Sequence, residues 1–141
     1  MSDPPIIPVL AAVFTRPDGT VLLARRRPEL HNGGRWEFPG GKLRPDESPE
    51  ACLRREIREE LGVDIDVVAP YHLVRHRYPS IHILLIAYHC RLESEAWQLT
   101  DHDMVAWVRP DAMVHEVLSA ADRAIADRLR ERFPAGAPGT R

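Results

Sequence analysis

The sequence is poor in the features that mark cross-linked, membrane-spanning or polyanion-binding proteins. Only two cysteines occur among its 141 residues, Cys52 and Cys90, so a disulfide framework is excluded. No apolar run approaches the roughly 20 residues that a membrane helix needs. The 19 basic residues nearly balance the 21 acidic ones, for a formal net charge of −2, which leaves no basic surplus for a nucleic-acid polymer or an anionic membrane. No secretory signal is recognisable at the start, so we expect a cytoplasmic protein without those partners.

The length and composition predict a single domain of the α/β class. Its 44% apolar and 28% charged residues are ordinary for a globular protein. We expect one domain over residues 1–141, with an ordered core at about 6–133 and a short tail at 134–141. Strands come first, one helix lies in the middle and one at the end, which predicts a mixed β-sheet covered by helices on both faces.

The apolar patterns place the individual elements along the chain. The first two strands are separated by the turn residues 16–19, which predicts a β-hairpin. The first helix is framed by Ser48 and Pro49 as its N-cap and first residue and by Gly62 as its stop. Strands are expected at 8–14, 20–24, 71–78, 81–90 and 104–108, and helices at about 49–61 and 119–133.

Three carboxylates share one face of the first predicted helix. Glu56, Glu59 and Glu60 stand at positions i, i+3 and i+4, which brings them within about 6 Å of one another. Such a cluster repels itself unless cations offset the charge, and Mg²⁺ or Mn²⁺ prefers carboxylate oxygens. The alternative is a solvated face balanced by the arginines of the same helix.

The surrounding residues favour the metal-binding interpretation. Gly41 is followed by Glu47 after five residues, and seven residues later comes the run 55–63, Arg-Glu-Ile-Arg-Glu-Glu-Leu-Gly-Val. This pattern resembles the Nudix box at every defining position. Over about residues 8–133 the chain resembles the MutT-like branch of the Nudix hydrolases. The resemblance implies a Nudix α/β/α sandwich that hydrolyses a nucleoside diphosphate linked to another group.

The resemblance also implies a Mg²⁺ cofactor, with Mn²⁺ as a substitute. The ligands it implies are the Gly40 carbonyl and the side chains of Glu56, Glu59, Glu60 and Asp101. Asp103 is the alternative to Asp101, whose side chain is shorter than the glutamate common at that position. Glu56 is the first candidate for the general base and Glu59 the second. Glu47 and Arg55 are expected to pair and brace the loop against the helix, with Gly41 and Gly62 as further structural support.

A second set of residues is assigned to the substrate from the same resemblance. These residues are Arg26, His31, Glu37, Phe38, Pro39, Lys42 and Asp122. Asp122 stands where MutT-like proteins read a purine with an asparagine. An ionised carboxylate only accepts hydrogen bonds, which suits the exocyclic amino group of cytosine. The alternative role of Asp122 is to cap the last helix together with Ser119. His102, beside Asp101, is expected at the border of the site.

The predicted reaction is attack of water on a nucleoside triphosphate, which releases the nucleoside monophosphate and pyrophosphate. We favour cytidine substrates, namely CTP, dCTP or their 5-substituted forms. The alternatives are 8-oxo-dGTP, an ADP-sugar or a dinucleoside polyphosphate as substrate, or a non-catalytic module that binds a nucleotide. The sequence is compatible with a monomer or a homodimer.

Overall fold

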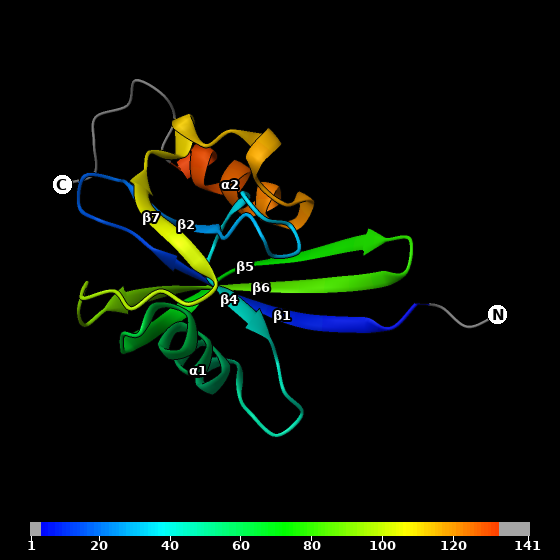
Figure 1. Cartoon of the computed structure of the whole chain (residues 1–141). Helices are drawn as coiled ribbons and strands as arrows, with labels where there is room; N and C mark the ends of the chain where they lie inside the picture. Colours follow the sequence, from blue (N-terminus) through cyan, green and yellow to red (C-terminus); the bar gives the residue numbers. More distant parts are fainter. Residues whose placement is uncertain (1–3, 133–141) are drawn as a thin grey trace.

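The computed structural model describes residues 4–132, which form two β-sheets between two α-helices (Figure 1). The α/β fold with a mixed sheet is confirmed. The helices are α1 (Pro49–Leu61) and α2 (Ala120–Arg132), and short 3₁₀ turns lie at Pro110–Ala112 and His115–Val117. The strands are β1 (Ile6–Phe14), β2 (Val21–Arg26), β3 (Trp36–Glu37), β4 (Gly40–Lys42), β5 (Ile65–Tyr78), β6 (Ile81–Leu92) and β7 (His102–Val108).

The strands divide into a sheet of four and a sheet of three. The first has the order β4-β1-β6-β5 and the second the order β3-β2-β7. Strands β1 and β6 run parallel, whereas the other pairs are antiparallel. The four-stranded sheet is therefore mixed, and β1 lies inside it.

Strand β1 is buried on both of its faces. Leu10 and Phe14 belong to the apolar cluster that contains α1, while Ala11 and Val13 belong to the cluster that contains α2. Successive side chains of a strand point to opposite faces, so an uninterrupted apolar run suits a strand covered from both sides. Figure 1 shows α1 and α2 on opposite sides of this strand.

The predicted hairpin between the first two strands is wrong. Strands β1 and β2 belong to different sheets and meet only at one bridge, between Thr15 and Val21. The turn itself is present, because the N–H of Gly19 donates to the Arg16 carbonyl at 2.9 Å. Turn residues reverse the chain without fixing which strands pair. Strand β1, which is apolar on both faces, pairs instead with β4 along one edge and with β6 along the other.

Helix α1 begins and ends where the sequence predicts. The Ser48 hydroxyl accepts a hydrogen bond from the N–H of Ala51 at 3.1 Å, and Pro49 is the first helical residue. Gly62 adopts a left-handed conformation with φ of 72° and donates its N–H to the Arg58 carbonyl. These caps fix the position of the three helical glutamates along the chain.

Other boundaries differ from the predictions. Strand β5 begins at Ile65, earlier than expected, and β4 was not expected because its glycines and lysine have low strand propensity. The predicted tail at 134–141 lies outside the described residues. No helix within residues 4–132 combines the length and the apolar character needed to cross a bilayer.

Candidate active site

A cavity of about 730 Å³ lies between the C-terminal part of α1 and the N-terminal part of α2. Its wall includes apolar side chains from β6, such as Ile83 and Leu85. Most of the residues predicted to form the site line it, from both ends. These are Arg26, His31, Glu37, Phe38, Gly40, Gly41, Lys42, Glu60 and Asp122.

Two glycines let the backbone of β4 pass close to its neighbours. A Cβ atom on Gly41 would collide with the Glu56 carboxylate, and one on Gly40 would collide with the Leu10 carbonyl of β1. The absence of side chains at these positions brings β4 against both the helix and the central strand. The box glycine therefore leaves the space that the Glu56 carboxylate occupies.

Arg55 organises the carboxylates on the outer side of α1. Its guanidinium binds Glu47 through two contacts of 2.6 and 3.0 Å, and it lies 2.7 Å from Glu56 and 3.3 Å from Glu59. The guanidinium lowers the pKa of Glu47 to about 2. A further bond from Arg55 to the Lys42 carbonyl ties the loop to the helix. The geometry predicted for the Glu47–Arg55 brace is present.

Glu60 is different from the other helical glutamates because it is buried. The residue is 9% exposed, and its Oε2 has no hydrogen-bond partner among residues 4–132. Burial raises the pKa of its carboxyl to about 9, and the carboxylates of Glu37 and Glu56 contribute in the same direction. A buried carboxyl beside two other acids, with one oxygen unused, fits a divalent cation that would offset the charge.

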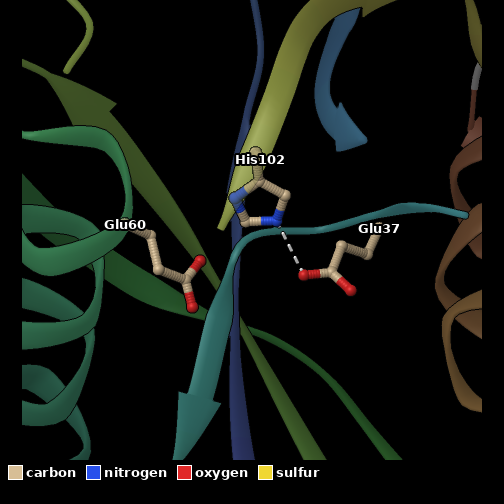
Figure 2. Close-up of side chains that lie close together, drawn as sticks. All are labelled: Glu37, Glu60 and His102. Carbon is tan, nitrogen blue, oxygen red and sulfur yellow. Dashed lines mark hydrogen bonds and ion pairs between the residues drawn. The ribbon is translucent and has the colours of Figure 1, made fainter. Parts of the chain in front are cut away.

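Figure 2 shows Glu37, Glu60 and His102 converging from three different elements. Each offers one ligand atom, and these atoms lie within 4.8 Å of one another. His102 is completely buried, and its Nε2 lies 2.9 Å from Glu37 Oε2. The sequence placed His102 only at the border of the site. Its inward position follows from strand alternation, because both of its neighbours are exposed.

The other end of the cavity is formed by Asp122 on α2. The residue is 7% exposed, and its Oδ2 accepts a hydrogen bond of 3.4 Å from the backbone N–H of Phe38. Its own N–H donates to the Ser119 hydroxyl at 3.3 Å. Asp122 therefore takes part in the predicted cap of α2 and also lines the cavity. Burial, reinforced by the Glu37 carboxylate, raises the pKa of Asp122 to about 7.

Arg26 and His31 stay together at the rim of the cavity. The Nε of Arg26 donates to the His31 carbonyl at 3.0 Å, and its Nη1 lies 3.7 Å from Glu37 Oε2. The arginine is therefore held by contacts on two sides while one side faces the cavity.

Asp101 and Asp103 do not line the cavity. Both are exposed. The backbone carbonyl of Asp101 accepts from the N–H of Arg27 at 2.9 Å. Asp103 forms an ion pair of 2.8 Å with Arg25, which lowers the pKa of that aspartate. His102, the residue between them, lies instead in the cluster with Glu37 and Glu60.

Comparisons with known proteins agree with this geometry. The sequence model of the NUDIX domain matches residues 5–129. The chain belongs to the Nudix family. It is 38% identical over 118 residues to the CTP pyrophosphohydrolase of Escherichia coli (strain K12), which covers 83% of this chain and 86% of that protein. It is 40% identical over 85 residues to the 8-oxo-dGTP diphosphatase of Proteus vulgaris, which covers 60% of this chain and 76% of that protein.

Solved structures of similar proteins share the fold. The solution structure of the E. coli ORF135 protein is 33% identical, with a TM-score of 0.75 and coverage of 94% of this chain and 96% of that one. The crystal structure of the MutT protein from Methanosarcina mazei Go1 is 25% identical, with a TM-score of 0.80 and coverage of 95% and 99%. The chain is thus a MutT-like Nudix hydrolase.

Some predicted residues of the Nudix site lie beside the cavity instead of in its wall. Glu56 packs against Gly41, and the side chain of Glu59 is 54% exposed. The Pro39 carbonyl accepts a hydrogen bond from the N–H of Ala12, so this proline anchors the segment to β1. Of the three clustered glutamates, the helix therefore presents Glu60 to the cavity and keeps Glu56 and Glu59 outside its wall.

Proposed function

We propose that this Nudix hydrolase cleaves a nucleoside triphosphate, with Mg²⁺, into the nucleoside monophosphate and pyrophosphate, and that it prefers cytidine nucleotides. The observation that carries the proposal is a cavity with Glu60 at one end and a buried carboxyl, Asp122, at the other. The similarity to a protein named CTP pyrophosphohydrolase supports the same substrate class.

The α1 end supplies the oxygen donors for the metal. We assign the Gly40 carbonyl and the carboxylates of Glu56, Glu59 and Glu60 to Mg²⁺, with Mn²⁺ as a substitute. The unused oxygen of the buried Glu60 supports this assignment. A bound divalent ion lowers the pKa of a water molecule and neutralises phosphate charge. Asp101, the fifth predicted ligand, is exposed and lies outside the cavity wall.

The residues around this end orient the reacting groups. Glu56 takes the proton from the attacking water, and Arg55 holds its carboxylate at 2.7 Å. Lys42, which directly follows the box glycine Gly41, lines the cavity and binds the phosphates through its positive charge. Arg26 binds the phosphates from the rim of the cavity. Glu59, with its exposed carboxylate, is the second candidate for the base.

The α2 end supports recognition of a base through both protonation states of Asp122. Burial raises its pKa to about 7, so the neutral carboxyl as well as the carboxylate is available near neutral pH. The neutral carboxyl both donates and accepts, and thus complements the ring nitrogen and the amino group of cytosine. The ionised form accepts from the amino group alone.

The same observation favours a second candidate, 8-oxo-dGTP. A neutral carboxyl can imitate the donor and acceptor of an asparagine amide, which weakens the argument that aspartate excludes this purine. The similarity to an 8-oxo-dGTP diphosphatase supports this candidate as well.

The deciding experiment measures turnover of CTP, dCTP, 8-oxo-dGTP and ADP-ribose under identical Mg²⁺ conditions, with the products separated. We expect the largest kcat/KM for a cytidine nucleotide, with CMP or dCMP and pyrophosphate as products. A larger kcat/KM for 8-oxo-dGTP than for every cytidine nucleotide would contradict the proposed preference for cytosine. Release of inorganic phosphate alone would contradict the proposed cleavage into nucleoside monophosphate and pyrophosphate.

A further inference from the structure

We propose that His102 is a positioning residue that fixes the Glu37 carboxylate in the middle of the cavity, between the α1 and α2 ends. The inference rests on the proposed function and on the prediction from the sequence that Glu37 contacts the substrate. His102 itself does not line the cavity, so its effect passes through Glu37.

The contact between the two side chains is specific. His102 is 0% exposed, and its Nε2 lies 2.9 Å from Glu37 Oε2. A carboxylate only accepts hydrogen bonds, so the histidine donates from Nε2, which fixes its tautomer. Burying a polar ring costs free energy unless it is hydrogen-bonded. An apolar side chain would fill this space without that cost, so packing alone does not account for the histidine.

The bond joins elements that are far apart in the sequence. His102 begins β7 and Glu37 ends β3, and these strands lie on either side of β2. Strand β2 carries Arg26, whose Nη1 is 3.7 Å from the same carboxylate oxygen. Two cationic or hydrogen-bonding groups therefore hold Oε2 of Glu37 from different strands and restrict its rotation.

The position of Glu37 influences both ends of the cavity. Its negative charge contributes to the raised pKa of Glu60 at the α1 end and of Asp122 at the α2 end. A nucleotide that extends from the metal-binding end to Asp122 must pass this carboxylate. A small displacement of Glu37 would disturb the contacts that bind the substrate.

The experiment compares H102L, H102Q, E37Q and the H102L/E37Q double variant in steady-state kinetics with the preferred nucleotide. Loss of a hydrogen-bond partner behind a metal ligand typically costs 10- to 100-fold, and we take the lower end of this range for the partner of Glu37. We expect H102L to raise KM about 10-fold with a much smaller change in kcat. H102Q keeps an N–H donor and should recover most of the loss. The double variant should be no worse than E37Q alone, because both changes remove the same interaction.

A matched control comes from another histidine–carboxylate pair. His115 Nε2 lies 2.7 Å from Asp127 Oδ1, and neither residue lines the cavity. H115L should therefore leave KM unchanged. Equal losses in H102L and H102Q, or losses that multiply in the double variant, would overturn the inference in favour of simple packing. If H102L keeps the KM of the wild-type protein, the inference about His102 fails while the proposed function stands. If the wild-type protein does not hydrolyse any nucleoside triphosphate, the proposed function itself fails.

Discussion

The two ends of the cavity use carboxylates in different ways. At the α1 end, Glu56 and Glu59 share the guanidinium of Arg55, while Glu60 is buried with an unused oxygen. At the α2 end, Asp122 is buried and accepts a hydrogen bond from the backbone N–H of Phe38. Several negative charges at one end suit a cation and the phosphates common to all nucleotides. A single protonatable carboxyl at the other end suits discrimination between bases.

The largest effect is expected at the α1 end. Replacing Glu60 with Gln removes a carboxyl group that we assign to the metal. Because a bound metal supplies several kcal/mol of charge stabilisation, kcat should fall at least about 100-fold for every nucleotide. Titration with Mn²⁺ should show weaker metal binding by the same variant. E50Q is the matched control, because Glu50 lies in the first turn of α1 and outside the cavity wall. Normal turnover by E60Q would remove Glu60 from the assignment.

A smaller effect is expected at the α2 end, and it should depend on the substrate. D122N makes the side chain a permanent donor and acceptor, so the ratio of kcat/KM for 8-oxo-dGTP to that for CTP should rise about 10-fold. Parallel assays with both nucleotides measure this ratio. A uniform loss for the two substrates would mean that the α2 end does not select the base.

A further effect is expected in the pH dependence of stability without metal. The folded pKa of Glu60, about 9, exceeds its ordinary 4.5, and that of Asp122, about 7, exceeds its ordinary 3.8. The folded state therefore keeps protons that the unfolded state releases, so the free energy of unfolding falls as the pH rises through these ranges. Each group contributes at most about 1.4 kcal/mol per pH unit.

Urea unfolding in EDTA at several pH values between about 5 and 9 separates the two groups. E60Q should lessen the slope above about pH 7, where Glu60 still titrates and Asp122 does not. D122N should lessen the slope below about pH 7 and leave the upper part intact. A wild-type stability that rises across this pH range would contradict the burial of both carboxyls.

The α1 end could be predicted from the sequence because its geometry is local. Helical spacing relates Glu56, Glu59 and Glu60, and the caps of α1 fix where that spacing begins and ends. The burial of Glu60 alone among them could not be predicted, because it depends on how β4 approaches the helix.

The remaining parts of the site depend on contacts between distant segments. The bond between His102 and Glu37 joins residues 65 positions apart, and that between Phe38 and Asp122 joins residues 84 positions apart. Neither pairing leaves a periodic pattern in the chain. The error over the first hairpin has the same origin, because an apolar run reveals that β1 is buried but not which strands bury it.

The parallel pairing of β1 with β6 has a consequence for folding during synthesis. Residues 6–14 pair with residues 82–90, so β1 is synthesised about 75 residues before its partner strand. Contacts of such separation slow folding, and an apolar strand with an open edge is prone to associate with other chains. A nascent chain that pauses before residue 90 therefore exposes the apolar strand β1 without its partner β6. We expect such a chain to depend on chaperones at that stage.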